Sequence, residues 1–78
     1  MKKVIIYTTS RCPYCLMAKE FLRQKGIPFE EKNVENDRTA AEEMISKSGQ
    51  YAVPVIDIEG KIIVGFNPRL IERTLAEP

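Results

Sequence analysis

The chain has 78 residues, of which 44% are hydrophobic and 29% are charged, and its formal net charge is +1. This composition is typical of a small globular protein, so we expect one domain over residues 1–78 and no nucleic-acid partner. The apolar run after Lys3 ends at Tyr7. It is too short for a membrane span or a secretory signal, so we expect a cytoplasmic protein without a membrane partner.

A strand and a helix are predicted at the start of the chain. The β-branched and aromatic run from Lys3 to Thr8 predicts a strand covered on both faces. A helical spacing of apolar residues follows and predicts a helix from Pro13 to Lys25, closed by Gly26 at its C′ position. The inward face of this helix should carry Cys15, Ala18 and Leu22, flanked by Met17 and Phe21.

A second strand and a second helix come next. The strand is expected from Ile27 to about Val34, because a proline such as Pro28 is tolerated where a strand begins. Asn36 or Asp37 should cap the helix, which ends at Gly49. Its inward side is expected to carry Ala41, Met44, Ile45 and Ser48.

A hairpin and a last helix complete the pattern. Two short apolar runs, Val55–Ile58 and Lys61–Val64, flank Glu59-Gly60, which favours a tight turn. Asn67-Pro68 should open the helix as N-cap and N1 residues, with Leu70, Ile71, Thr74 and Leu75 facing inward. The order β-α-β-α-β-β-α predicts an α/β fold with three helices on a four-stranded mixed sheet, in which the first two strands are parallel and the last two antiparallel.

The two cysteines of the chain, Cys12 and Cys15, stand three residues apart where the first helix should begin. Cys12 would be the N-cap and Pro13 the N1 residue. A sulfur at the N-cap can accept hydrogen bonds from the N–H groups of N2 and N3, and the helix dipole adds positive potential, so a thiolate is favoured at Cys12. The spacing predicts a redox dithiol in which Cys12 attacks a disulfide and the less exposed Cys15 resolves the mixed disulfide.

Two cations lie near this pair in the sequence. Arg11 either adds to the field that stabilises the thiolate or is a solvated surface side chain. Lys19 lies two helical turns beyond Cys12, roughly 10 Å by helix rise, so its effect on Cys12 should be largely screened.

A Cys-x-x-Cys pair also fits an inert disulfide or half of a metal site. An inert disulfide would close too short a loop to add much stability. The chain has no histidine and no third cysteine. We therefore expect no complete metal site within one chain. A metal or iron–sulfur cluster bound through Cys12 would have to bridge two chains at a dimer interface or borrow an external thiol such as that of glutathione.

The combined motifs resemble the glutaredoxin family. The resemblance rests on Ile6-Tyr7-Thr8, Cys12-Pro13-Tyr14-Cys15, Ala18-Lys19, Gly26, Val53-Pro54 and Gly65. It implies the thioredoxin fold and a thiol–disulfide oxidoreductase that reduces protein disulfides without a tightly bound cofactor. It also implies that the Val53-Pro54 bond is cis and that the backbone of Val53 pairs with the substrate chain as an added strand.

The resemblance leaves two electron donors open. Glutathione-dependent members carry a lysine where Thr9 stands and paired glycines where Val64-Gly65 stand. Arg11, Asn67 and the last helix N-terminus could still hold a glutathione carboxylate, so glutathione remains a candidate co-substrate. Gly65-Phe66-Asn67-Pro68 resembles NrdH-type redoxins instead, which implies thioredoxin reductase as donor and ribonucleotide reductase as a candidate substrate. Pro13-Tyr14 favours the glutaredoxin pattern.

Several residues are candidates for binding the substrate. Phe66 could be a core residue or an exposed contact for a partner, and Tyr14 could line the substrate groove or cover the start of the helix. Gln50 and Tyr51 are weaker candidates. We expect a monomer whose substrate-binding residues are Arg11, Tyr14, Val53, Pro54, Gly65, Phe66 and Asn67.

Overall fold

The computed structural model describes residues 2–78, and its elements follow the predicted order. These are β1 (Val4–Thr8), α1 (Pro13–Gln24), β2 (Glu30–Asn33), α2 (Arg38–Ser48), β3 (Val55–Ile58), β4 (Lys61–Val64) and α3 (Pro68–Ala76). The strands form one sheet in the order β2-β1-β3-β4. Strand β1 is parallel to β2 and antiparallel to β3, and β3 is antiparallel to β4. The predicted mixed sheet is therefore confirmed.

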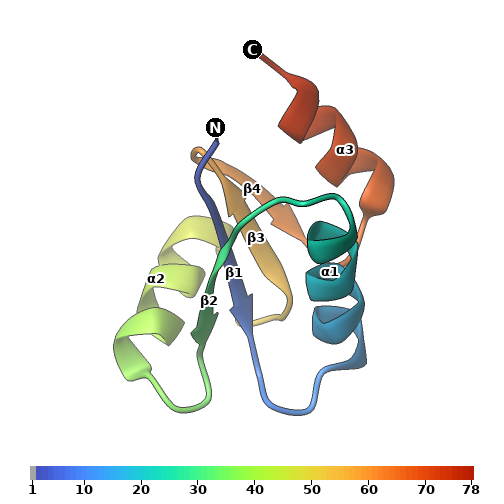
Figure 1. Cartoon of the computed structure of the whole chain (residues 1–78). Helices are drawn as coiled ribbons and strands as arrows, with labels where there is room; N and C mark the ends of the chain where they lie inside the picture. The colour runs from blue at the N-terminus through green and yellow to red at the C-terminus, as the bar shows by residue number, and fades with distance from the viewer. Residues whose placement is uncertain (1) are drawn as a thin grey trace.

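The helices cover both faces of the sheet, with α1 and α3 on one side and α2 on the other (Figure 1). Ile6 and Tyr7 are both fully buried, and they point to opposite faces because side chains alternate along a strand. Strand β1 is thus covered on both faces, as predicted. The core beneath α1 and α3 consists of Val4, Ile6, Ala18, Leu22, Ile56, Ile58, Ile63 and Ile71, and the core beneath α2 of Tyr7, Val34, Ala40, Met44 and Val55.

The end of α1 explains why β2 begins later than predicted. The N–H of Gly26 donates to the carbonyl of Arg23 at 3.0 Å, and that of Ile27 donates to the carbonyl of Leu22 at 2.9 Å. These two bonds form a Schellman cap, with Gly26 at a φ of 70°. Because Ile27 is part of the cap and Pro28 has no N–H, the pairing with β1 starts only at Glu30.

The expected inward faces of α2 and α3 need correction. Helix α2 is capped by Asp37 and not by Asn36, and it buries Ala40 and Met44, whereas Ile45 is 42% exposed. In α3, Ile71 and Thr74 are buried, but Leu70 is 36% exposed. Each helix meets the sheet along a narrow stripe. An apolar residue one position along the helix is rotated by about 100° around the helix axis, so its side chain points away from the sheet. For the same reason Met17 on α1 is exposed.

The hairpin between β3 and β4 has the predicted tight turn. Glu59 and Gly60 both have positive φ values, 52° and 90°, which is the pattern of a type I′ turn. The N–H of Gly60 also donates to the side chain of Asp57 at 2.7 Å. This turn fixes the register in which Val55 faces Val64 at the other end of the hairpin.

Candidate active site

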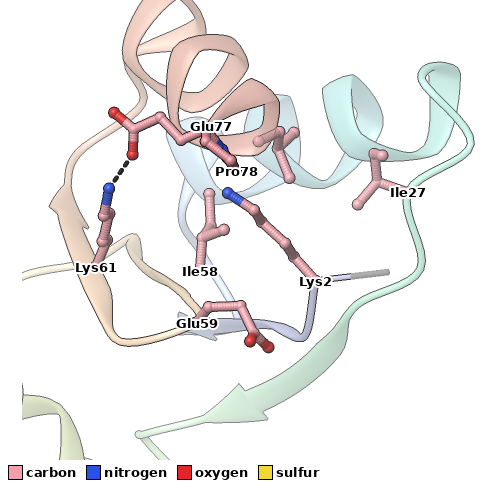
Figure 2. Close-up of a pocket in the computed structure, with 8 residues that line it drawn as sticks. Lys2, Ile27, Ile58, Glu59, Lys61, Glu77 and Pro78 are labelled. Carbon is pink, nitrogen blue, oxygen red and sulfur yellow. Dashed lines mark hydrogen bonds and ion pairs between the residues drawn. The ribbon is translucent and has the colours of Figure 1, made fainter.

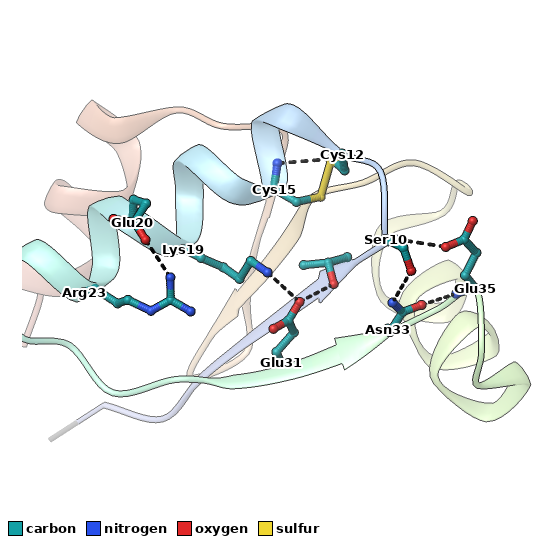
Figure 3. A network of polar contacts seen from close by, with 10 residues as sticks. Ser10, Cys12, Cys15, Lys19, Glu20, Arg23, Glu31, Asn33 and Glu35 are labelled. Carbon is teal, nitrogen blue, oxygen red and sulfur yellow. Dashed lines mark hydrogen bonds and ion pairs between the residues drawn. A yellow bond between two sulfur atoms is a disulfide. The ribbon is translucent and has the colours of Figure 1, made fainter.

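The dithiol lies at the N-terminus of α1, just after the loop that follows β1 (Figure 3). Cys12 is the N-cap, with φ −130° and ψ 101°, and Pro13 is the first helical residue. The backbone N–H of Cys15, the N3 residue, donates to the Sγ of Cys12 at 3.1 Å. The two cysteines form a disulfide, with their Cα atoms 5.1 Å apart. The structure therefore represents the oxidised form, and the predicted capping by Cys12 is confirmed.

The two sulfurs differ in their exposure. Cys15 is only 1% exposed and lies on the same buried face of α1 as Ala18 and Leu22. Cys12 is half-buried. A partner molecule can therefore reach the sulfur of Cys12 more easily than that of Cys15.

The loop before Cys12 is held by the connection between β2 and α2. The N–H of Ser10 donates to the Glu35 carboxylate at 2.9 Å, and the Asn33 side chain donates to the Ser10 hydroxyl at 3.2 Å (Figure 3). The hydrogen bonds from the Ser10 backbone and side chain, helped by the charge of Arg11, hold the pKa of Glu35 below its ordinary value. The exposed Arg11 is thus placed near an opposite charge. Sequence reasoning missed Glu35, because no local pattern connects it with Ser10.

A second polar group lies beneath α1. The hydroxyl of Thr8 and the ammonium of Lys19 donate to the same carboxylate oxygen of Glu31, at 2.7 and 2.9 Å (Figure 3). The bond from Thr8, followed by that from Lys19, lowers the pKa of Glu31. This arrangement joins β1, α1 and β2. Glu31 was not expected from the sequence, because no local pattern distinguishes it from the neighbouring Glu30 in the same strand.

The strand register brings the Val53-Pro54 segment to the same end of the sheet as the dithiol. Tyr7 pairs with Val55, so Pro54 lies opposite the end of β1, from which the chain continues to Cys12. The Val53-Pro54 bond is cis, as the resemblance implied. The N–H of Gly65 donates to the carbonyl of Pro54 at 2.8 Å. Val53, Pro54 and Gly65 are therefore adjacent.

The backbone of Val53 keeps its hydrogen-bonding capacity. Within residues 2–78, neither its N–H nor its carbonyl forms a hydrogen bond with another part of the chain. The side chain of Val53 packs against the core beneath α2, and Pro54 is fully buried. The side chains are thus anchored while the peptide groups of Val53 are available to another strand.

The remaining candidates form the surroundings of this end of the sheet. Phe66 is half-buried and packs edge-on against Phe21, with ring centroids 5.8 Å apart, so it is attached to the core. Asn67 caps α3 by accepting a hydrogen bond from the Leu70 N–H at 3.1 Å. Tyr14 and Tyr51 are exposed to 62% and 60%. Thr9 is half-buried, Val64 is exposed, and Gln50 is an exposed residue after α2.

A cavity of about 660 Å³ lies at the other end of the sheet (Figure 2). Its lining includes Lys2, Ile58 and Glu59, and Ile58 pairs with the first residue of β1, far along the strand from the dithiol loop. Lys61 and Glu77 form an ion pair at its edge. This cavity is separate from the redox site, because neither cysteine nor the Val53-Pro54 segment contributes to its lining.

Two further observations concern the part of the chain that the structure describes. Over residues 2–78, no three or more histidine, cysteine, aspartate or glutamate side chains are grouped so that they could hold a metal ion. Among the same residues, no helix combines the length and the apolar character of a membrane span.

Comparisons with known proteins agree with this geometry. The family model described as "Glutaredoxin" matches residues 4–63. A glutaredoxin-like 8.6 kDa protein of the rubredoxin operon of Clostridium pasteurianum is 49% identical over 70 residues, covering 90% of this chain and 93% of the relative. Glutaredoxin 3 of Escherichia coli is 43% identical over 65 residues, covering 83% of this chain and 78% of the relative.

Solved structures give the same result. The glutaredoxin of Archaeoglobus fulgidus superposes with a TM-score of 0.89 at 29% identity, covering 99% of this chain and 89% of that one. The NrdH-redoxin of Escherichia coli superposes with a TM-score of 0.84 at 30% identity, covering 97% and 96%. These neighbours confirm the thioredoxin fold. The chain therefore belongs to the glutaredoxin family, and its Cys12–Cys15 pair makes it a thiol–disulfide oxidoreductase.

Proposed function

We propose that the protein reduces disulfide bonds in other proteins, with Cys12 as the nucleophile and Cys15 as the resolving thiol. The observation that carries this proposal is the unequal placement of the two sulfurs. The Sγ of Cys12 caps α1, accepts the N–H of Cys15 at 3.1 Å and is accessible from outside, whereas Cys15 is buried. A position at a helix N-terminus stabilises a thiolate, which is the reactive form.

The proposed cycle has two exchanges. The Cys12 thiolate attacks one sulfur of the substrate disulfide, forms a mixed disulfide and displaces the other substrate sulfur, which takes up a proton. Cys15 then loses its proton and attacks the Sγ of Cys12, which releases the second substrate thiol. The substrate gains two electrons and two protons, and the protein is left with the Cys12–Cys15 disulfide present in this structure.

Residues around the dithiol are suited to hold an extended substrate segment. The unpaired N–H and carbonyl of Val53 could bond to the backbone of that segment, as in strand addition. Tyr14 exposes an aromatic ring beside the cysteines, and Phe66 adds a partly buried one at the start of α3. In this proposal Pro54 and Gly65 shape the segment that carries Val53.

We further propose that electrons come from a thioredoxin reductase and not from glutathione. Thr9 and Val64 stand where glutathione-dependent relatives have a lysine and a glycine, and the charge of Arg11 also acts on the carboxylate of Glu35. The Escherichia coli NrdH-redoxin is described as having a thioredoxin-like activity profile. Ribonucleotide reductase is then a candidate substrate. Residues 1–78 would act as one monomeric domain in the reducing cytoplasm.

Two NADPH-coupled assays test the electron donor. One supplies thioredoxin reductase, the other supplies glutathione with glutathione reductase, and both use the same protein disulfide, such as insulin. We expect faster NADPH oxidation with thioredoxin reductase. A Thr9→Lys variant is the matched probe, because a cation at this position should improve turnover with glutathione. A native protein that is reduced faster by glutathione would contradict the proposed donor but not the dithiol cycle.

A further inference from the structure

The buried position of Cys15 raises the question of how its proton is lost during resolution. A thiol in an apolar environment resists ionisation, because burial disfavours the charged form. Cys15 is 1% exposed and lies between the helix and the sheet. The capping contact serves Cys12, since the Cys12 sulfur is the acceptor of the N–H of Cys15. Cys15 therefore needs another group that favours its thiolate.

Lys19 is placed to do this. Residues four apart in a helix have neighbouring side chains, with Cβ atoms about 5–6 Å apart, so Lys19 follows Cys15 on the same side of α1. The Lys19 side chain is only 19% exposed and lies along the sheet instead of extending into solvent. Figure 3 shows it reaching from α1 toward Glu31, on the side of the helix that carries Cys15. Although Lys19 is remote from Cys12, it is one turn from Cys15.

The ammonium of Lys19 is fixed in this place by Glu31, and Glu31 is itself held by Thr8. The Nζ of Lys19 donates to Glu31 at 2.9 Å, and the same carboxylate oxygen accepts the hydroxyl of the fully buried Thr8 at 2.7 Å. Thr8 is the last residue of β1, four positions before Cys12, so this contact joins the strand that leads into the dithiol loop to the helix that follows it. Arg23 also acts on Glu31 from one turn further along α1, and is itself paired with Glu20 at 2.7 Å.

We propose that Lys19 is a positioning residue for the resolving step: held by Glu31, which Thr8 anchors, its ammonium stabilises the thiolate of Cys15 while that thiolate attacks the Cys12 sulfur. This inference rests on the proposed two-cysteine cycle. The proton of Cys15 leaves to solvent, the new bond joins the two protein sulfurs, and the substrate sulfur departs with the electron pair of the broken bond. Glu31 has a double effect, because it holds Lys19 in place and also offsets part of its charge.

The two steps can be timed separately with an aromatic disulfide that releases coloured thionitrobenzoate. In a stopped-flow experiment with reduced protein, the first release reports the attack by Cys12. The second reports resolution by Cys15, and its rate against pH gives the apparent pKa of Cys15. For Lys19→Gln we expect the second release to slow by about threefold to tenfold at neutral pH, which is the effect expected when one charge is removed about one helical turn from the thiolate. The first release should be unchanged.

Three further variants separate charge from structure. Lys19→Arg keeps the charge and should restore the second release. Glu31→Gln removes the negative charge but keeps an amide oxygen that can accept the bonds from Lys19 and Thr8, so it should lower the apparent pKa of Cys15. Lys19→Gln should raise that pKa. Lys25→Gln removes a lysine from the C-terminal end of α1, where it pairs with Glu72 at 2.5 Å, and should change neither phase. If the variants acted only through a loss of packing, Lys19→Gln and Glu31→Gln would shift the apparent pKa of Cys15 in the same direction.

The proposal requires the two opposite shifts and the rescue by arginine, and any other pattern overturns it. Thermal unfolding of each oxidised variant establishes that the fold is intact. If the native protein releases only one thionitrobenzoate, the two-cysteine cycle itself is wrong. If it releases two, but the second phase does not respond to Lys19, the cycle holds and only the role of Lys19 fails.

Discussion

The two faces of the sheet are built in different ways. Beneath α1 and α3 the core is an apolar layer of eight buried residues, and the polar contacts of Thr8, Lys19 and Glu31 lie at its border. Beneath α2 the apolar cluster is smaller, and next to it lies a charged network. The dithiol belongs to the first face. The comparison indicates that apolar packing supports the helix that carries the chemistry, while a smaller apolar cluster and a charged network together hold the helix on the other side.

The charged network beneath α2 is centred on Tyr7 and Lys47. The Tyr7 hydroxyl donates to Glu43 at 2.8 Å and accepts from Lys47 at 2.7 Å, and Lys47 also donates to Asp57 at 2.7 Å. Lys32 adds an ion pair with Glu43 at 2.9 Å. The network joins α2 to β1, β2 and β3. It lies on the face opposite to α1, so it can be altered without touching the cysteines.

The largest effect is expected from the cysteines themselves. Cys12→Ser should abolish disulfide exchange, because no nucleophile is left at the accessible position. Cys15→Ser should retain the first exchange and accumulate a mixed disulfide, which mass spectrometry detects as a covalent adduct. An adduct with the Cys12→Ser protein and none with Cys15→Ser would reverse the assigned roles.

Core truncations should distinguish the two faces. Leu22→Ala and Met44→Ala each remove a fully buried side chain, and each should lower the free energy of unfolding by about 2–5 kcal/mol in urea titrations. Only Leu22→Ala should also change the rate of disulfide exchange, because Leu22 lies on the helix that carries both cysteines. Equal effects of both variants on the exchange rate would show that the faces are not independent.

Asp57→Asn tests the charged network with a smaller expected loss. Asp57 is 8% exposed, and its replacement leaves the ammonium of Lys47 facing a neutral amide. We expect the free energy of unfolding to fall by about 1–3 kcal/mol, with an unchanged exchange rate. Glu42→Gln is the matched control, because its pair with Arg38 is exposed and long at 3.8 Å, and it should have no measurable effect on stability.

The smallest expected effect is a loss of stability in alkali. Burial, the largest influence, lowers the pKa of Lys47, but its hydrogen bonds to Asp57 and Tyr7 outweigh it and raise the pKa from 10.5 to about 12. The unfolded chain therefore releases this proton first as the pH rises. The stabilisation is complete below pH 10.5 and is lost as the pH rises toward about 12. Urea unfolding of the oxidised protein should show this loss, and Lys47→Met should reduce it. If the free energy of unfolding of the native protein and that of Lys47→Met depended on pH in the same way, Lys47 would not be the cause of the loss.

Most of the fold could be predicted from the sequence because its signals are local. The N-caps at Cys12 and Asn67, the glycines after α1 and α2, and the turn at Glu59-Gly60 each act within a few residues. The start of β2 could not be predicted, because Ile27 was taken up by the helix cap. Which of two neighbouring apolar residues faces the sheet depends on how the helix is rotated, and Ile45 is the example.

The site was predictable to the extent that it follows from the Cys-x-x-Cys spacing. The positions of Cys12 and Cys15 follow from helix geometry, and the cis bond before Pro54 follows from the family resemblance. The polar contacts on the two faces of the sheet were not predictable, because they join residues far apart in sequence. Thr8 and Glu31 are separated by 23 positions, and Tyr7 and Lys47 by 40. No periodicity within one element encodes such a contact.

The capping bond at Cys12 has a thermodynamic consequence for the protein as a redox couple. The N–H of Cys15 donates to the sulfur that also performs the chemistry. A negatively charged sulfur accepts such a bond more strongly than a disulfide sulfur. The bond therefore stabilises the dithiol form selectively and shifts the couple toward a more oxidising potential. The stability of the first turn of α1 and the reduction potential of the protein thus both depend on this hydrogen bond.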